Sequence, residues 1–402
     1  MKGFRMKYDF TTIMDRRGHD ALAVDYMFAE PKEGFDAIPM WVADMNYATA
    51  PAVIDAIRGR LEHGAFGYFR PRQEYYDEII SWLKRRKDMD FVTQDMIGYD
   101  SGVLGGVTSA LKAFKPANDK VLIHAPTYTG FTGCLTNAGF TLVHSYLKVD
   151  ENGIWRMDFE DMAKKIEEEG ITAAVFCSPH NPCGRVWERW EVEGAMAVFE
   201  KHGVKVVSDE IWSDLILTGY KHTPTLSVSD YAKNNVAAMY AITKTYNLAG
   251  MVGSYHVVCN PELKAAVEEQ CGKSHYNNMN VLSMYAMLGA YSPAGEEWLE
   301  ELLQVLSDNV NYACDYINER FEGVCVSRPQ GTYMLFPDFS GWLEKTGKTM
   351  DDLCTAMDDI GCMICDGRPF HGQSHLRINV ALPKAKVVEA FERMDKYIFN
   401  VK

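Results

Sequence analysis

The sequence has no apolar run close to the roughly 18 uninterrupted residues that a membrane-spanning helix needs, and its start holds no apolar core of signal-peptide length. It also has no excess of positive charge, because the formal net charge is -14 at pH 7. This balance argues against a broad basic surface for nucleic acid or anionic membranes. We therefore expect a cytoplasmic protein that binds neither nucleic acid nor membranes.

The ten cysteines lack the dense, regular spacing of a disulfide scaffold, which fits a reducing compartment. The pair Cys362-Met-Ile-Cys365 has no second pair at zinc-ribbon spacing. We interpret it as two positions on one face of a short strand. His371 and His375 stand four apart, but Gly372 between them argues against a metal-binding helix face. We expect no metal site.

What is present is typical of a globular protein: 402 residues, 47% of them apolar and 24% charged, without repeats or low-complexity tracts. Short apolar segments alternate with helical or loop stretches from residue 101 to about residue 259. This alternation predicts a mostly parallel sheet covered by helices on both faces, with functional groups at the carboxyl ends of the strands. The expected strands are Val121–His124, Thr141–Leu147, Thr172–Cys177, Val204–Ser208, Val236–Ile242 and Ser254–Cys259.

The pattern changes after Tyr291-Ser-Pro-Ala-Gly295 to a long helix, Glu296 to about Phe321, followed by strands near Val324–Arg328 and Thr332–Phe336. We therefore expect an α/β protein with a second, smaller α+β domain built from both chain ends. The predicted boundaries give an N-terminal segment (1–50) that joins the small domain (293–402), and a large domain (51–292) between them.

One lysine, Lys244, follows the expected strand Val236–Ile242 in a short polar turn, and Ala249-Gly250 then lets the backbone turn away. Burial disfavours the ammonium form of such a lysine and leaves a neutral amine that can attack a carbonyl group. A lysine that merely caps a loop near the sheet is the alternative, and this stretch alone leaves both interpretations open.

Further polar residues follow other expected strands. Asp209 closes Val204–Asp209, Asn181 lies in a Pro/Gly turn after Thr172–Cys177, and Tyr128 follows Val121–His124. The Gly102–Gly106 turn opens a helix and offers N–H groups to a phosphate, although it lacks the strand-first context of a dinucleotide site. Together with Lys244 these residues suit pyridoxal phosphate (PLP), which needs a lysine, a carboxylate at its pyridine nitrogen and a phosphate cradle.

Several motifs spread over nearly the whole chain carry a family resemblance. They are Tyr8-Asp-Phe-Thr-Thr, Asp15-Arg-Arg-Gly18, Trp41-Val-Ala-Asp-Met45, His63-Gly-Ala-Phe-Gly-Tyr68, Ser178-Pro-His-Asn-Pro-Cys-Gly184, Ser208-Asp-Glu-Ile211, Thr243-Lys-Thr-Tyr-Asn-Leu-Ala-Gly250 and Leu376-Arg-Ile-Asn379. On these motifs the chain resembles the class I/II aminotransferase superfamily of PLP enzymes (fold type I). It is most similar to the MalY/PatB-type cystathionine β-lyases, through Asp15–Gly18 and Trp41–Met45.

The resemblance implies roles for individual residues. Lys244 would bind the cofactor covalently and act as the catalytic base, with Tyr128 and Tyr68 as further catalytic candidates. Arg377 would grip the substrate carboxylate, helped by Asn181, with Trp41 and Asn46 either in the channel wall or simply packed. Cofactor contacts would come from Lys244, Asp209, Asn181, Tyr128, Val103, Leu104, Thr243, Tyr68 and Trp212. Tyr68 would come from a neighbouring subunit, which implies a homodimer with composite sites.

Some positions depart from the family pattern. Asn46 and Tyr47 replace the usual Asp-Phe, and Trp212 stands where tyrosine or histidine is common. Val252 replaces a phosphate-binding arginine, and Ala241 replaces a serine. The phosphate would then depend on the glycine turn, Thr243 and Tyr68. His180 and Cys183 we interpret as structural.

The resemblance implies a carbon–sulfur β-lyase that cleaves cystathionine or related cysteine S-conjugates. A transaminase that uses Lys244, Asp209 and Arg377 in the same positions is the alternative. A third possibility is a protein that keeps the cofactor but works mainly as a regulatory partner.

Overall fold

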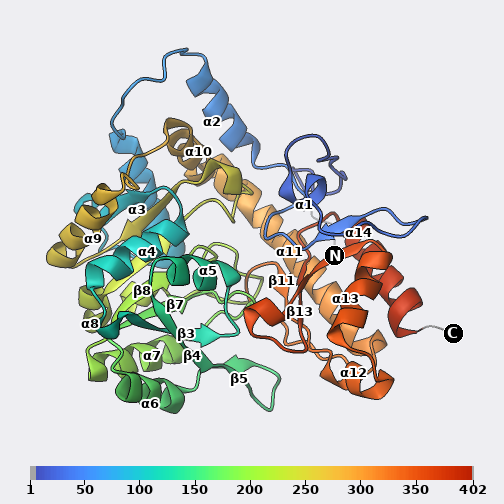
Figure 1. Cartoon of the computed structure of the whole chain (residues 1–402). Helices are drawn as coiled ribbons and strands as arrows, with labels where there is room; N and C mark the ends of the chain where they lie inside the picture. Colours follow the sequence, from blue (N-terminus) through green and yellow to red (C-terminus); the bar gives the residue numbers. More distant parts are fainter. Residues whose placement is uncertain (1–5, 401–402) are drawn as a thin grey trace.

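A seven-stranded sheet forms the centre of the larger part of the molecule (Figure 1). The structure is a computed structural model that describes residues 6–400. The strand order is β2-β10-β9-β8-β7-β3-β4, and β10 alone runs antiparallel to its neighbours. The strands are β2 (Ile97–Asp100), β3 (Lys120–Ala125), β4 (Thr141–Tyr146), β7 (Ala173–Cys177), β8 (Lys205–Asp209), β9 (Val236–Tyr240) and β10 (Ser254–Val257).

Both faces of this sheet are covered by helices, as its apolar strands predict. In β7, Val175 packs in the core under α4, α5 and α9, whereas its neighbour Phe176 packs in the core on the α6 and α7 side. Successive residues of a strand point to opposite faces, so an unbroken apolar run supplies both cores. The helices of this part are α2 (Pro51–Leu61), α3 (Gln73–Lys87), α4 (Val103–Phe114), α5 (Thr129–Asn137), α6 (Phe159–Glu169), α7 (Arg189–His202), α8 (Asp230–Asn235), α9 (Pro261–Lys273) and α10 (Val281–Tyr291).

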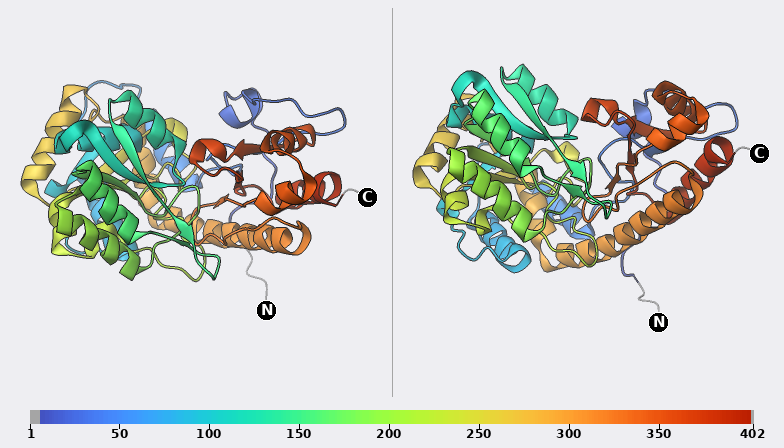
Figure 2. Two further views of the ribbon diagram at one scale, coloured as in Figure 1. Left: turned by 60° about the horizontal axis from the view of Figure 1, so that its bottom comes forward. Right: turned by 90° about the horizontal axis from the view of Figure 1, so that it is seen from below.

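The smaller sheet takes strands from both ends of the chain, in the order β1-β12-β13-β11. Its first strand, β1, runs parallel to β12, with Ile38 opposite Cys362. The long helix α11 (Pro293–Arg320) leads to it from the larger part of the molecule (Figure 2). The other elements are α1 (Leu22–Asp25), β1 (Ile38–Met40), β11 (Met334–Leu335), α12 (Ser340–Thr346), α13 (Met350–Asp359), β12 (Cys362–Asp366), β13 (Leu376–Asn379) and α14 (Lys384–Met394), with a short ribbon of β5 (Lys148–Val149) and β6 (Trp155–Arg156).

The predicted fold class is confirmed, one strand was missed, and two local predictions are wrong. Strand β2 was not foreseen, because four residues next to a glycine turn carry too little pattern. The segment Val324–Arg328 forms no strand but a single bridge from Cys325 to Asp338. Cys362 and Cys365 do lie on one strand, yet their odd spacing puts them on opposite faces.

The domain boundaries remain a prediction, and residues 1–5 and 401–402 of the outer segments lie outside the described residues. Among the helices between residues 6 and 400, none combines the length and the apolar character that a membrane crossing requires.

Candidate active site

The carboxyl ends of parallel strands β3, β7, β8 and β9 meet at one edge of the sheet, and a cavity of about 150 Å³ lies there. The residues that line it are Ala43, Val103, Leu104, Tyr128, Cys177, Asn181, Asp209, Ile211, Trp212 and Lys244. The structure thus brings together most of the residues that the sequence predicts to contact the cofactor.

Lys244 is largely buried in the wall of this cavity, and its Nζ donates a hydrogen bond to the carbonyl oxygen of Ala43 at 2.8 Å. Burial, reinforced by the positive charge of Arg377, lowers the pKa of Lys244 from 10.5 to about 8, against the opposing effect of Asp44 and Asp209. A substantial fraction of the amine is therefore neutral near pH 8, and the neutral amine is the nucleophilic form.

Asp209 ends β8 and is buried, and Ile211 donates its backbone N–H to the carboxylate at 3.0 Å. Burial raises the pKa of Asp209 to about 7, Glu210 adds to the rise, and Lys244 opposes it. A cationic N–H placed against this carboxylate would favour its charged form. Asp209 therefore has the environment that a protonated pyridine nitrogen requires.

Two further features of the cavity fit the remaining groups of PLP. The Oδ1 atom of Asn181 is buried without a hydrogen-bond partner among the described residues, so a ligand group can satisfy the amide. Helix α4 begins after Gly102, whose φ is +130°, and the first-turn N–H groups of Val103 and Leu104 have no partner within the helix. Such N–H groups suit a phosphate.

A larger, open cavity of about 990 Å³ adjoins the first and shares Ala43, Tyr128 and Lys244 with it. Arg377 lines the larger cavity and is 5% exposed, and its guanidinium packs on the Phe370 ring at 4.6 Å. Burial lowers the pKa of Arg377. One bond goes to protein: Nη2 donates to the carbonyl oxygen of Trp41 at 2.8 Å.

The other two nitrogens of Arg377, Nε and Nη1, are buried without partners among the described residues. A buried guanidinium with unused donors is costly unless an anion pairs with it. Arg377 therefore offers unused donors that would suit a carboxylate, in the cavity that Lys244 also lines.

A backbone segment that we call the strap, Trp41–Tyr47, passes between Lys244 and Arg377, and each of the two donates to one of its carbonyl groups. Two asparagines fix the rest of it. Asn247 accepts from the N–H of Met45 at 2.9 Å and donates to the carbonyl groups of Met45 and Tyr47, each at 2.9 Å. Asn379 donates to the carbonyl groups of Val42 and Asp44 at 2.7 and 2.6 Å.

Sequence reasoning missed Asn247 and Asn379, although both stand inside motifs that it quoted. It also missed the pairing of Arg16 with Asp44, in which Nη1 and Nη2 reach the two carboxylate oxygens at 3.1 and 2.5 Å. Arg16 belongs to the Asp15–Gly18 motif, so this motif also holds the strap.

Three other predicted residues lie at these cavities. Tyr128 lies in the wall of both and packs edge-on against Phe131, with ring centroids 5.5 Å apart. Trp212 is buried beside Lys244 and packs edge-on against Tyr333 at 4.9 Å. Trp41 lines the larger cavity, and its indole N–H donates to the carbonyl oxygen of Ala23 at 3.2 Å.

Three predicted residues line neither of these two cavities. Thr243 lines a separate small pocket with Tyr75 and Gly253. Asn46 accepts a hydrogen bond from Arg16 at 3.2 Å and lines a different cavity beneath the N-terminal segment. Tyr68 is fully exposed in the loop after α2, at the top of Figure 1. Their proposed roles in binding stay predictions.

Comparison with known proteins identifies relatives over most of the chain. The family model "Aminotransferase class I and II" matches residues 37–394. Cystathionine beta-lyase PatB of Bacillus subtilis (strain 168) is 34% identical over 362 residues, which cover 89% of this chain and 92% of PatB.

Solved structures are similar as well. A PLP-bound protein of Clostridium difficile 630, named provisionally as an aminotransferase, has a TM-score of 0.90 and 33% identity, and the match covers 97% of this chain and 100% of that one. The PLP-bound C-S lyase of Staphylococcus hominis has a TM-score of 0.87 and 29% identity, with 98% of each chain covered.

The environment of Lys244 predicts the pH dependence of cofactor attachment. Because the neutral amine reacts, the rate at which apoprotein attaches PLP to Lys244 should rise with pH to a midpoint near 8 rather than 10.5. Stopped-flow absorbance from pH 6.5 to 10 would measure it. In an Arg377→Met variant, which lacks the nearby positive charge, the midpoint should move to higher pH. A midpoint above about 10 in the native chain would contradict this account of the lysine.

Proposed function

The chain belongs to the class I and II aminotransferase family, and from this premise we propose that it is a PLP-dependent carbon–sulfur β-lyase. It takes cystathionine or related cysteine S-conjugates and water to pyruvate, ammonia and a thiol. The observation that carries the proposal is the position of Lys244. It lines both the smaller cavity, which contains Asp209, and the larger cavity, which contains Arg377. The names of the lyases PatB and the Staphylococcus hominis enzyme support this choice over transamination.

Substrate binding begins with the attraction between opposite charges. Arg377 holds the α-carboxylate of the amino acid with its unused Nε and Nη1 donors, because a guanidinium can bond both carboxylate oxygens at once. This contact places the Cα–H bond toward Lys244, which the strap holds next to Arg377. Tyr128 and Trp212 supply aromatic walls to the smaller cavity.

Lys244 carries out the proton transfer. With its pKa lowered to about 8, the Nζ of Lys244 can take the Cα proton near neutral pH and return it as an acid. PLP, when bound, supplies the sink for the electron pair left at Cα. Asp209, through its buried carboxylate, would hold the pyridine nitrogen of PLP in its cationic form. The thiolate at Cβ then leaves, with a proton from Lys244 or from a tyrosine.

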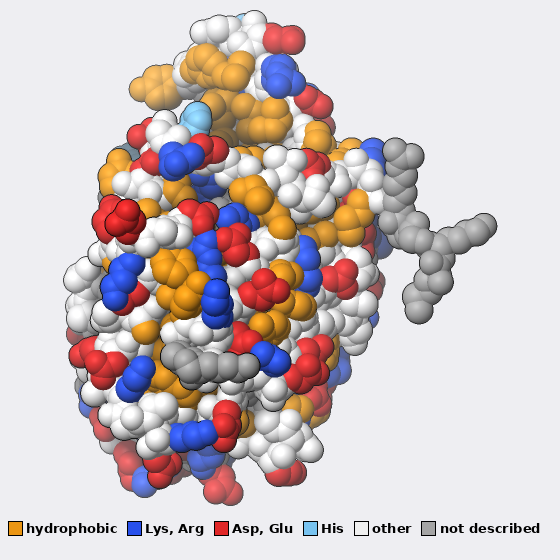
Figure 3. Space-filling view, turned by 90° about the vertical axis from the view of Figure 1, so that its right-hand side faces the viewer, with side chains coloured by type: hydrophobic (Ala, Val, Ile, Leu, Met, Phe, Trp, Pro, Cys, Tyr) orange, Lys and Arg blue, Asp and Glu red, His pale blue; other side chains and the backbone are white. Residues whose placement is uncertain are grey.

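We also propose a homodimer with composite sites, in which Tyr68 reaches the partner's cavity. The loop that carries it exposes Phe66, Tyr68 and Phe69 in the single chain. Figure 3 is turned about the vertical axis from Figure 1, so the top of the molecule is the same in both. Hydrophobic side chains gather there, where α2 and this loop lie. Exposed aromatic groups of this kind suit a protein interface.

A cytoplasmic location is part of the proposal. All ten cysteines lie within the described residues and are free thiols, as expected in a reducing compartment.

The β-lyase reaction predicts steady release of pyruvate and thiol, in equal amounts, from holoenzyme given L-cystathionine without any keto acid. Arg377→Met should lower kcat/KM about 100-fold through loss of the carboxylate contact. The matched control Arg189→Met removes an exposed arginine that pairs with Glu193 on α7, and it should leave kcat/KM unchanged.

A transaminase would instead stop after one turnover per site until a keto acid is added. That result, with no pyruvate from a panel of cysteine S-conjugates, would refute the lyase proposal.

Composite sites predict complementation between two inactive variants. Tyr68→Ala and Lys244→Ala should each be inactive alone. After subunit exchange, about a quarter of the wild-type activity should return, because each mixed dimer holds one intact site. Light scattering would establish the dimer. If Tyr68 served its own subunit, no mixed dimer would have an intact site and mixing would restore nothing.

A further inference from the structure

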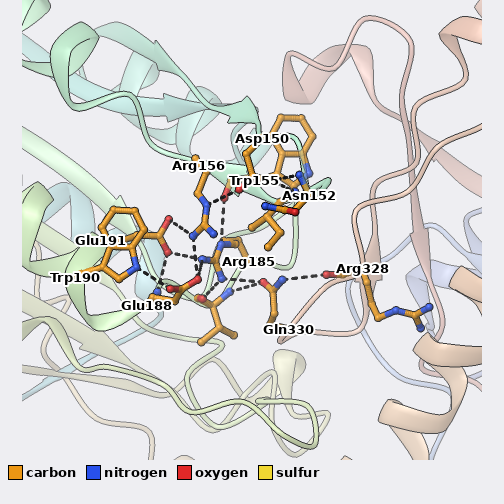
Figure 4. A network of polar contacts seen from close by, with 12 residues as sticks. Asp150, Asn152, Trp155, Arg156, Arg185, Glu188, Trp190, Glu191, Arg328 and Gln330 are labelled. Carbon is orange, nitrogen blue, oxygen red and sulfur yellow. Dashed lines mark hydrogen bonds and ion pairs between the residues drawn. The ribbon is translucent and has the colours of Figure 1, made fainter.

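A network of charged side chains, with Arg185 and Glu191 buried at its centre, adjoins the turn that carries Asn181 (Figure 4). Its centre is Arg185, which is 3% exposed. Nε of Arg185 donates to the carbonyl oxygen of Trp155 at 3.1 Å, and Nη2 donates to Glu188 at 3.0 Å and contacts Glu191. Arg156 pairs with Glu191 at 3.1 Å, so two guanidinium groups share this buried carboxylate.

A single amide links this network to the segment that leads into the smaller sheet. The buried Oε1 of Gln330 accepts from Arg185 Nη1 and from the backbone N–H of Val186, both at 3.2 Å. Its Nε2 donates to the carbonyl oxygen of Arg328 at 3.1 Å. In Figure 4, Gln330 lies between Arg185, on its left, and Arg328, on its right. All three polar contacts of the amide are thus to protein.

The turn itself is closed tightly against this segment. His180 donates its N–H to the carbonyl oxygen of Arg185 at 2.8 Å. The carbonyl oxygen of Gly184 accepts from the N–H groups of Gln330 and Gly331 at 2.9 and 3.0 Å. A Cβ atom on Gly184 would lie 2.3 Å from that of Pro329, so the two backbones touch. Among residues 6–400, no group donates a hydrogen bond to the amide oxygen of Asn181, which lies inside this turn.

The same segment continues to the strand that carries the substrate arginine. After Gln330 and Gly331 the chain enters β11, where Leu335 pairs with Ile378 of β13. Arg377 precedes Ile378 on that strand. One continuous stretch therefore contacts the turn of Asn181 at one end and the strand of Arg377 at the other.

We propose that Arg185 and Gln330 form a clamp that positions Asn181 in the cofactor cavity and ties its position to the sheet that carries Arg377. This inference rests on the proposed function only in so far as the cavity holds PLP. Both residues act through Asn181 and touch neither cofactor nor substrate, so they are positioning residues.

The chemistry of the clamp favours positioning over stability alone. Burying a guanidinium and a carboxylate costs desolvation energy that their attraction only roughly offsets, and apolar residues of similar volume often stabilise a protein as well or better. Directional bonds, in contrast, select one geometry. Arg185 donates hydrogen bonds to five acceptors, and one of them is the side-chain oxygen of Gln330.

The test measures cofactor affinity, which does not depend on the reaction that follows. Gln330→Met keeps the volume and removes the hydrogen bonds. Equilibrium dialysis of holoenzyme should show the Kd for PLP raised about tenfold, with a shifted absorbance band of the bound cofactor. Gln330→Glu keeps a side-chain oxygen that can accept hydrogen bonds from Arg185 and Val186, so its Kd for PLP should be within about threefold of wild type. Melting of the apoprotein reports stability separately.

A matched control separates positioning from general destabilisation. Tyr231→Phe removes hydrogen bonds from the Tyr231 hydroxyl to the carbonyl oxygens of Phe199 and Val204, which precedes β8 at the end of the sheet away from Asp209. It should lower the apoprotein Tm and leave the Kd for PLP unchanged. The same change in Kd for Tyr231→Phe and Gln330→Met would overturn the clamp.

A double-mutant cycle then asks whether the clamp acts through Asn181. In an Asn181→Ala background, Gln330→Met should raise the Kd for PLP no further. Fully additive effects would overturn the proposal, as would a wild-type Kd for Gln330→Met. A wild-type enzyme that binds PLP but releases no pyruvate would refute the lyase function and leave the clamp standing, so the two failures are distinguishable.

Discussion

The site depends on one hydrogen bond, from the amine of Lys244 to the carbonyl oxygen of Ala43. A buried amine needs an acceptor, and a carboxylate in that position would hold it as ammonium. A carbonyl group satisfies the donor without a full negative charge. Burial and the charge of Arg377 can then lower the pKa of the lysine even though Asp44 and Asp209 oppose them. The lysine thus remains anchored and reactive at once.

The strap that supplies this carbonyl group also explains why lysine and arginine work as one site. Lys244 follows a strand of the larger sheet and Arg377 lies on a strand of the smaller one, yet both bond to the same seven-residue segment. Asn247, in the turn after Lys244, and Asn379, on β13, bond to the backbone of this segment, and Arg16 pairs with its Asp44. The strap therefore links the lysine and the arginine directly.

The buried charges of Arg377 and Asp209 suit groups of opposite charge. Arg377 is buried with unused donors, and Asp209 is buried with a pKa raised to about 7. Each is unfavourable in the protein alone and becomes favourable beside an opposite charge, a carboxylate for the first and a cationic ring N–H for the second. The cost of burying these two groups would then favour ligands that carry both charges, as an amino acid together with PLP does.

The residues that could be predicted from the sequence are those with a local signal. Three of them, Lys244, Asp209 and Asn181, stand at or just after the ends of apolar strands. Because the carboxyl ends of parallel strands lie at one edge of the sheet, the strand pattern predicts that these residues meet at one cavity. Asn247 and Asn379 were missed because each binds backbone atoms 200 or more positions away, and such contacts leave no periodicity. Thr243 shows the converse: next to Lys244 in sequence, it lies in a different pocket.

The central claim is that Lys244, among all lysines of the chain, carries the cofactor. Reduction of the holoenzyme with borohydride, followed by digestion and mass spectrometry, would fix the cofactor to the lysine that holds it. The account predicts one pyridoxyl group per chain, on the peptide that contains Lys244. A pyridoxyl group on another lysine, with Lys244 unmodified, would contradict the assignment of the site and the chemistry built on it.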